Sequence, residues 1–223
     1  MSNLEPKKLN FNIDNFEGCE NGKIIEYERQ QAEIKKQADY EKYKNSGVPD
    51  KFFESSLDTY IAETEEEKRN LAMVKDFAQD PKNRILLLCG NNGNGKSHLL
   101  SGIIRECGGE YITSSQLCVE YEAATSYHSK RTREEILRHY SKVSLLVIDE
   151  CGKYTVNEKL EQFILAYIFS ARYENDLATG AATNAEKKTF LEFLGKSVFD
   201  RCTEVCTTLD FTGPSKRQER RII

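Results

Sequence analysis

Residues 85–104 read ILLLCGNNGNGKSHLLSGII: an apolar run, a loop rich in glycine and asparagine, and an apolar stretch at helical spacing. The apolar run predicts a buried strand, and the last stretch predicts a helix. The loop between them, Gly90–Ser97, is a full match to the pattern G-x-x-x-x-G-K-[ST]. Glycines let backbone N–H groups turn towards phosphate oxygens, and the helix N-terminus adds the positive end of its dipole. We therefore expect a nucleotide site at this loop.

All eight loop residues are expected to contact the nucleotide: Gly90, Asn91, Asn92, Gly93, Asn94, Gly95, Lys96 and Ser97. Lys96 should reach the β- and γ-phosphates, and the Ser97 hydroxyl should bind Mg²⁺. The alternative is a chance glycine loop, and the flanking strand and helix count against it.

Further apolar runs alternate with longer helical segments in the rest of the chain. The predicted strands are Arg84–Cys89, Glu110–Thr113 and Val143–Ile148, with weaker ones at Leu177–Thr183 and Glu204–Phe211. Strands that are apolar on both faces and alternate with helices are typical of a parallel sheet. We therefore expect an α/β fold, a parallel β-sheet flanked by helices.

An acid pair, Asp149-Glu150, follows the apolar run that starts at Leu145. Asp149 lies 53 residues after Lys96. The end of that strand should lie beside the phosphate loop, because parallel strands share one carboxyl edge. Asp149 would then hold Mg²⁺ through water, and Glu150 would orient and deprotonate an attacking water. The alternative is an ordinary strand end that happens to carry two acids.

The acid pair also separates classes of phosphate-loop protein. A GTPase would carry an Asn-Lys-x-Asp guanine reader, and none occurs in the sequence. A small-molecule kinase usually lacks the adjacent glutamate, because its substrate hydroxyl attacks in place of water. Hydrolysis of a nucleotide is the favoured reaction.

Composition excludes several other classes. Hydrophobic residues make up 39% and charged residues 30% of 223, enough for a core and against a disordered chain. The net charge of −4 disfavours a protein that coats DNA, so any DNA contact should be a local basic patch. The longest apolar run, Phe163–Phe169, is far too short to cross a membrane. Seven irregularly spaced cysteines predict reduced thiols and no structural metal, so we expect a soluble cytoplasmic protein.

The N-terminal part of the chain differs from the rest. Residues 23–45 contain no Gly or Pro and are dense in charge, which predicts a polar helix with a thin apolar stripe. Ser46-Gly-Val-Pro49 should break that helix. We therefore divide the chain into a short helical arm, residues 1–47, and a nucleotide domain, residues 48–223. A helix that simply rests on its own domain is the alternative for the arm.

Several segments together resemble the AAA+ ATPases, and more narrowly the DnaC-type helicase loader family related to DnaA and IstB. They are a lead-in at Gly47–Phe53, the phosphate loop with its following histidine at Gly90–His98, and Tyr111–Ser115. The resemblance implies the P-loop AAA+ fold, ATP and Mg²⁺ as cofactors, and ATP hydrolysis. It also implies that His98 contributes to the nucleotide site.

The same resemblance implies roles for three residues beyond the acid pair. Asn184, after the fourth strand, would be a polar sensor that holds the attacking water or the γ-phosphate. Arg201 would be an arginine finger acting on a neighbouring subunit, which implies a homo-oligomer or an assembly templated by a helicase. Arg217, in Gly213-Pro-Ser-Lys-Arg217, would sense the subunit's own nucleotide. The alternatives are a turn asparagine, a surface ion pair with Asp200, and a basic tail.

The segment between the second and third strands is longer than a crossover needs. In DnaA- and DnaC-like proteins a helical insertion at this position touches single-stranded DNA. By that resemblance Lys130, Arg131 and Arg133 would contact phosphates, and Tyr127 would stack on a base. A solvated loop between two helices is the alternative.

Taken together, these features predict an ATP-dependent protein that loads a replicative hexameric helicase onto single-stranded DNA, with no membrane partner. The resemblance to the loader family alone implies that the arm contacts the helicase. Two other functions stay open. One is an IstB-like ATPase that assists a transposase on duplex DNA. The other is a P-loop kinase or nucleotide-binding protein unrelated to DNA.

Overall fold

The computed structural model describes residues 20–126, 129–153 and 156–216. It divides into two compact units, residues 1–41 and residues 42–223. The helices of the described chain are α1 (Glu20–Lys44), a short 3₁₀ turn η1 (Asp50–Phe52), α2 (Glu65–Gln79), α3 (Lys96–Cys107), α4 (Ser114–Ala123), α5 (Arg133–Lys142), α6 (Glu158–Glu174), α7 (Lys187–Leu194) and α8 (Lys196–Val205). The strands are β1 (Ile85–Gly90), β2 (Glu110–Thr113), β3 (Leu145–Cys151), β4 (Ala178–Thr183) and β5 (Cys206–Phe211).

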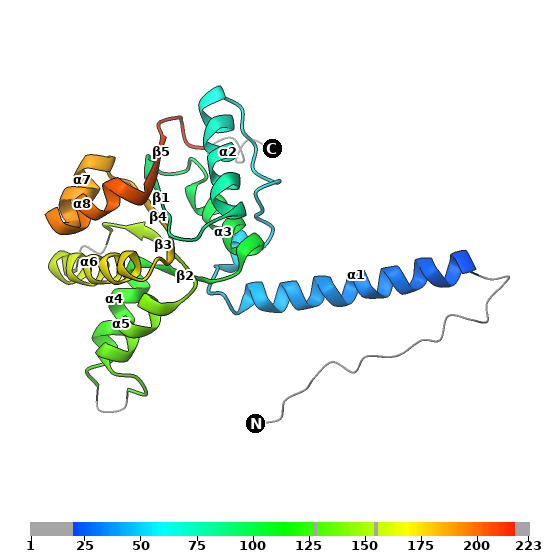
Figure 1. Cartoon of the computed structure of the whole chain (residues 1–223), viewed down its shortest axis with the longest axis horizontal. Helices are drawn as coiled ribbons and strands as arrows, with labels where there is room; N and C mark the ends of the chain where they lie inside the picture. Colours follow the sequence, from blue (N-terminus) through cyan, green and yellow to red (C-terminus); the bar gives the residue numbers. More distant parts are fainter. Residues whose placement is uncertain (1–19, 127–128, 154–155, 217–223) are drawn as a thin grey trace. The chain divides into compact units, whose positions relative to one another are not determined.

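The five strands form one parallel sheet in the order β2-β3-β4-β1-β5. This confirms the predicted α/β fold with helices on both faces (Figure 1). The strand β1, which leads into the phosphate loop, lies between β4 and β5. The carboxyl ends of all five strands therefore face one edge of the sheet, where a ligand site is expected in such folds.

The bounds of β3 and β5 differ from the prediction by two residues or more. β3 begins at Leu145, because Val143 caps α5 and donates its N–H to the carbonyl of His139 (3.2 Å). The same strand continues through the acid pair to Cys151. β5 begins only at Cys206, because the two residues before it complete α8. In both cases a helix end competes with the strand for the same residues.

Alternate side chains of β1 enter two different cores. Ile85 and Leu87 pack with residues of α5, α6 and α7 on one face of the sheet. Leu86 and Leu88 pack with residues of α2 and α3 on the other. The apolar run in the sequence is therefore explained by a strand buried on both faces.

Capping boxes start three of the described helices in the second unit, and the Asn157 side chain caps a fourth, α6. A capping box at Thr64 and Glu67 opens α2, with the Glu67 N–H donating to the Thr64 hydroxyl (3.1 Å). Thr113 and Thr132 form the same motif at the start of α4 and α5. Such caps fix where a helix begins.

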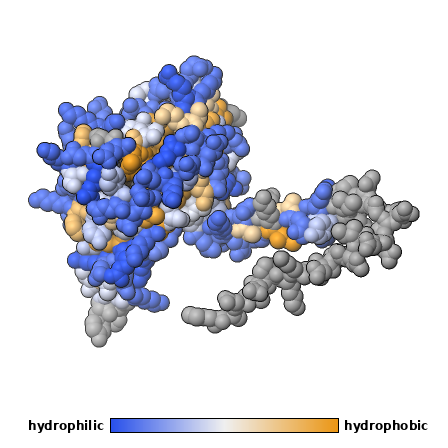
Figure 2. Space-filling model, in the orientation of Figure 1, coloured by the Kyte–Doolittle hydropathy of each residue, from blue (hydrophilic) through white to orange (hydrophobic). Residues whose placement is uncertain are grey.

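The described part of the first unit is a single helix, α1, over residues 20–41. Tyr27, Ile34 and Tyr40 are among its exposed apolar side chains. On the second unit, hydrophilic side chains cover most of the face seen in Figure 2, and hydrophobic atoms surface in small separate areas. Among the helices of the described residues, none has the length and apolarity that a membrane crossing needs.

Candidate functional site

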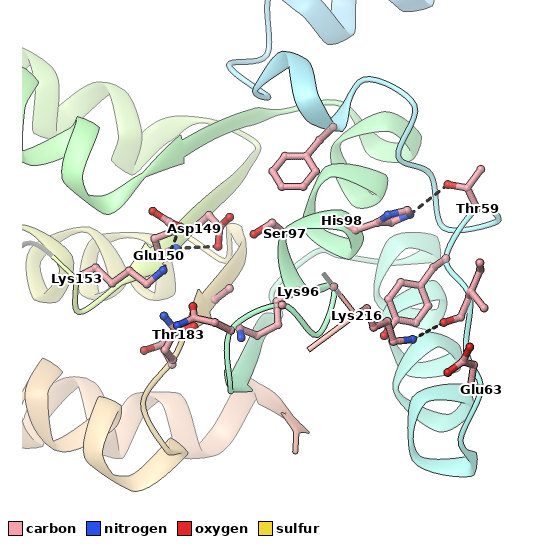
Figure 3. A pocket seen from close by; sticks show the side chains of 18 residues that line it. Thr59, Glu63, Lys96, Ser97, His98, Asp149, Glu150, Lys153, Thr183 and Lys216 are labelled. Carbon is pink, nitrogen blue, oxygen red and sulfur yellow. Dashed lines mark hydrogen bonds and ion pairs between the residues drawn. The ribbon is translucent and has the colours of Figure 1, made fainter. Parts of the chain in front are cut away.

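A cleft of about 430 Å³ lies at the carboxyl edge of the sheet and contains much of the predicted site. Its walls include, from the sequence prediction, Asn92, Gly93, Gly95, Lys96, Ser97, His98, Asp149, Glu150 and Asn184. They also include residues that the sequence did not single out, among them Phe52, Tyr60, Ile61, Glu63, Lys153 and Lys216. Figure 3 shows the acid pair and Thr183 on one side of Lys96, and Lys216 and Glu63 on the other.

The phosphate loop depends on its glycines. Gly90 has a φ of 120°, and a Cβ there would lie 2.2 Å from the carbonyl oxygen of Phe211. Gly95 caps α3 in the left-handed region, with a φ of 85° and the ring of Tyr60 against it. A side chain at either position would strain the backbone and push a neighbour away. The loop is therefore held in a narrow turn at the N-terminus of α3.

The Lys96 ammonium lies within the loop. It donates to the carbonyl oxygens of Gly90 (2.7 Å) and Asn91 (2.6 Å), and the residue is buried. A buried ammonium needs such acceptors, because desolvation of an unpaired charge is costly. The bonds hold the ammonium beside the N–H groups of the loop, where a phosphate would supply stronger acceptors.

The segment after β5 closes the loop from behind. The carbonyl of Phe211 accepts from the Asn91 N–H (3.2 Å) and from the Asn94 side-chain amide (2.9 Å). The same amide donates to the carbonyl of Gly213 (2.8 Å). Asn94 is thus turned towards β5, and neither it nor Asn91 and Gly90 is among the residues that line the cleft. Their role in the structure is to support the loop.

Lys216 ties this segment to the opposite wall of the cleft. Its N–H donates to the carbonyl of Gly93 (3.1 Å), and its ammonium donates to the carbonyl of Ile61 (2.6 Å). The ammonium also pairs with Glu67 (2.7 Å) and lies 4.9 Å from the centre of the Tyr60 ring. The only signal for Lys216 in the sequence is its place beside Arg217, because its partners lie some 150 residues earlier.

The pairing of Glu67 makes a pH prediction. Burial of Glu67 acts to raise its pKa, but hydrogen bonds from Lys216 and from the backbone of Glu63 and Thr64 outweigh it, so the pKa is lowered. A carboxyl with a lowered folded-state pKa stabilises the fold above its unfolded-state pKa of about 4.3, and this is lost as the pH falls through the folded-state value. We expect Glu67→Gln to flatten the acid side of the stability profile, measured by urea unfolding between pH 3 and 7. The prediction is wrong if the stability of Glu67→Gln falls as steeply with decreasing pH as that of the wild type.

Asp149 is held at the bottom of the cleft. The Tyr111 hydroxyl donates to one carboxylate oxygen (2.5 Å), and the Glu150 N–H donates to the other (2.8 Å). Asp149 is buried, and so is Tyr111. Burial and the nearby Asp149 charge raise the pKa of Tyr111, while a hydrogen bond with Ser97 acts in the opposite direction. Tyr111 therefore connects the two residues that the sequence predicts as metal ligands.

Glu150 follows in an unusual backbone conformation, with a φ of 59°. The left-handed region is uncommon for a residue with a side chain and marks functional turns. Its carboxylate pairs with Lys153 (3.1 Å), which also lines the cleft. Asn184 reaches the same cleft from the end of β4. The structure therefore brings Lys96, Ser97, Asp149, Glu150 and Asn184 together.

His98, in the first turn of α3, contacts the segment before α2. Its Nε2 lies 2.9 Å from the carbonyl of Ser56 and 3.1 Å from the Thr59 hydroxyl. Because a carbonyl only accepts, Nε2 carries the proton in this arrangement. His98 thus fixes the segment that carries Tyr60.

Arg201 lies on α8 and is not among the residues that line the cleft. Its guanidinium pairs with Glu174 (2.9 Å) and lies 5.8 Å from the centre of the Tyr173 ring. Arg217 and Tyr127, predicted to contact the nucleotide and a DNA base, lie outside the described residues.

A second feature, here called the basic hollow, lies on α5 and the turn before it. Its lining residues are Lys130, Arg131, Glu135, Arg138, His139, Lys142 and Val143. Lys130 and Arg131 were predicted from the sequence. Arg138 and Lys142 were not, although their spacing of four places them on one face of a helix. Arg133 is directed elsewhere, with its guanidinium 4.8 Å from the centre of the Tyr121 ring.

Comparison by sequence finds relatives for most of this unit. A family model described as RNA helicase matches residues 86–190, which contain the phosphate loop and the acid pair. The replicative helicase loader DnaC of Buchnera aphidicola (subsp. Acyrthosiphon pisum) is 29% identical over 168 residues, 70% of this chain and 66% of that protein. DnaC of Escherichia coli K12 is 27% identical over 165 residues, 71% of this chain and 67% of that protein. The match thus spans about two thirds of the relatives' length.

Solved structures share the fold at lower identity. A crystal structure of the DnaC helicase loader has a TM-score of 0.62 and 19% identity, over 74% of this chain and all of that one. A DnaI crystal structure gives 0.61 and 20%, over 76% of this chain and 94% of that one. DnaA bound to AMPPCP and single-stranded DNA gives 0.59 and 18%, over 78% of this chain and 55% of that one.

The family model thus covers the phosphate loop and the acid pair that the sequence singled out. Its sequence relatives and its fold together support a DnaC-type member of the AAA+ family.

Proposed function

We propose that this protein is an ATP-dependent helicase loader, which uses ATP binding and hydrolysis to deliver a replicative helicase onto single-stranded DNA. The observation that carries the proposal is the cleft, in which Lys96, Ser97, Asp149, Glu150 and Asn184 converge. Its relatives are named replicative helicase loader DnaC, which supports the biological context. The protein would carry out this function in the cytoplasm.

ATP and Mg²⁺ fit the donors of the cleft. The N–H groups of the loop and the Lys96 ammonium suit the phosphates, and the DnaA structure that shares this fold was solved with an ATP analogue. The Ser97 hydroxyl and the Asp149 carboxylate are hard oxygen donors, which Mg²⁺ prefers. Bound there, Mg²⁺ would neutralise charge on the β- and γ-phosphate oxygens. Tyr111 would keep the Asp149 carboxylate turned towards that position.

Hydrolysis would rest on Glu150 and Asn184. The Glu150 carboxylate would accept a proton from the attacking water, after the carboxylate has parted from Lys153. Asn184, at the end of the neighbouring strand, would orient that water or the γ-phosphate. Lys96 would exchange its two carbonyl acceptors for phosphate oxygens, which bear more charge.

Arg201 would act on the nucleotide of a neighbouring subunit, since it is not among the residues lining its own cleft. We expect Arg201→Ala to keep nucleotide binding and to lose on the order of 100-fold in hydrolysis rate, because a guanidinium no longer meets the developing charge. Action between subunits is tested by mixing two inactive variants, Arg201→Ala and Glu150→Gln. Turnover should return in the mixture, because Glu150→Gln subunits supply the missing arginine. A mixture that stays inactive would rule out action between subunits.

The basic hollow would contact the DNA backbone. Lys130, Arg131 and Lys142 are cations on its walls, and phosphate contacts of this kind need no base recognition. They would form the local basic patch that a protein of net negative charge needs in order to bind DNA. Acidic neighbours such as Glu135 limit the net charge, so we expect weak binding that declines steeply with salt.

The helicase contact is assigned to the arm, residues 1–47. In its described part, α1 leaves Tyr27, Ile34 and Tyr40 exposed on a helix otherwise rich in charge. Exposed apolar side chains on such a helix are suited to pack on a partner protein. Failure to bind a hexameric helicase from its own host would count against the loader function.

The deciding experiment measures ATP hydrolysis alone, with single-stranded DNA and with duplex DNA, against Glu150→Gln as the blank. A loader should be stimulated by single strands. Selective stimulation by duplex DNA would favour an ATPase that assists a transposase. Indifference to both, at protein concentrations high enough for assembly, would leave a kinase or a nucleotide-binding protein unrelated to DNA.

A further inference from the structure

A buried carboxylate lies behind the acid pair. Glu161, in the first turns of α6, is 1% exposed. One of its carboxylate oxygens accepts from the Ser114 hydroxyl (2.5 Å) and from the Gly152 N–H (2.8 Å). Ser114 is the first residue of α4, and Gly152 follows directly after β3. A single oxygen atom thus joins α4 and α6 to the turn that follows Glu150 and Cys151.

The backbone that leads into this turn has a conformation that Glu150 does not favour. Glu150 has a φ of 59° and Gly152 a φ of 79°, and the register between β3 and β4 shifts between Ile148 and Cys151. A non-glycine residue in the left-handed region is strained and persists only where its surroundings enforce it. Two side chains from other elements do so here. Glu161 binds the N–H of Gly152, and the Thr183 hydroxyl donates to the carbonyl of Cys151 (2.9 Å).

The chemistry of the acceptor explains why a glutamate suits this position. The carboxylate lies at the N-terminus of α4, where the helix dipole favours negative charge. Apolar side chains from the sheet and from α6 form the surrounding core, so a donor left without an acceptor there would be costly. The length of the glutamate side chain brings its oxygen from α6 to the backbone of the turn.

From this geometry we propose that Glu161 is a positioning residue for hydrolysis, whose carboxylate oxygen holds the turn after β3 so that Glu150 faces the cleft. The inference rests on the proposed function, because it concerns the placing of the base in that reaction. Glu161 does not line the cleft and does not touch the nucleotide site. Its effect should therefore fall on the rate of hydrolysis and not on nucleotide binding.

Two conservative substitutions separate position from charge. Glu161→Gln removes the charge and keeps a carbonyl oxygen at the same reach, so it can still accept from Gly152. Glu161→Asp keeps the charge and withdraws the oxygen by one methylene. We expect Glu161→Asp to lose about tenfold in kcat with an unchanged nucleotide Kd, because small misplacements of a reacting group are costly. The kcat of Glu161→Gln should stay within about threefold of the wild-type value, because its oxygen moves less than that of Glu161→Asp.

The control is Glu158→Asp, the same change at an exposed position in the same helix. All variants are compared by thermal unfolding, so that the assay runs where each is folded. The inference is overturned if Glu161→Asp keeps the wild-type kcat, if Glu161→Gln is the worse of the pair, or if Kd rises in step with the loss of rate. A wild-type protein with no turnover above the Glu150→Gln blank would overturn the proposed function as well, which distinguishes the two failures.

Discussion

Replacement of Lys96 by alanine is expected to weaken ATP binding on the order of 1000-fold. The ammonium would contact both terminal phosphates, and each charged hydrogen bond contributes about 1.5–3 kcal/mol. Its present acceptors, the carbonyls of Gly90 and Asn91, would lose a buried donor but can turn to water that enters the cleft. The fold should therefore survive while the site fails.

The measurement is titration of a fluorescent ATP analogue in the presence of Mg²⁺. Lys188→Ala is the matched control, because Lys188 is an exposed lysine in a surface pair with Glu192. It should bind as the wild type does. Tight binding by Lys96→Ala would show that the phosphates do not occupy this loop, and the nucleotide site would have to be sought elsewhere.

Glu150→Gln should give the opposite result: ATP binds normally, and hydrolysis drops on the order of 1000-fold. An amide has nearly the same shape as a carboxylate but cannot accept the proton of the attacking water, and a general base contributes about 10²–10⁴-fold. The substitution also removes the ion pair with Lys153. The positive charge of Lys153 would then attract the phosphates without competition from the Glu150 carboxylate. Binding should be equal or tighter for that reason.

Single-turnover hydrolysis of radiolabelled ATP separates this loss from a loss of binding. The exposed Glu186 offers the same change outside the cleft and serves as the control. If Glu150→Gln hydrolyses ATP at the wild-type rate, Glu150 is not the base, and the inference about Glu161 is lost with it.

Much of the fold was predictable from the sequence because its signals are local. The strand, loop and helix around Lys96 lie within twenty residues, and the apolar run before the acid pair identifies β3. The strand boundaries were wrong where a helix end, at Val143 or Val205, used the same residues. Periodicity does not determine which of two neighbouring elements takes a shared residue.

The parts of the site that the sequence missed depend on contacts between distant segments. Tyr111 meets Asp149 only because β2 pairs with β3, and Lys216 meets Tyr60 and Glu67 only once β5 lies beside β1. The Asn94 side chain supports the loop from behind, which the sequence did not indicate, while the contact of Asn94 with the nucleotide stays a prediction. No spacing in the chain distinguishes an asparagine that faces a ligand from one that faces a strand.

The support of the phosphate loop by residues 211–213 has a consequence for the order of events during synthesis. A ribosome completes the loop more than a hundred residues before it makes Phe211 and Gly213. Until then β1 lacks its neighbour β5, and the loop lacks the carbonyls that hold Asn91 and Asn94. Pairings this far apart in the chain form late in folding. A nascent chain should therefore be unable to capture ATP until β5 has emerged and joined the sheet.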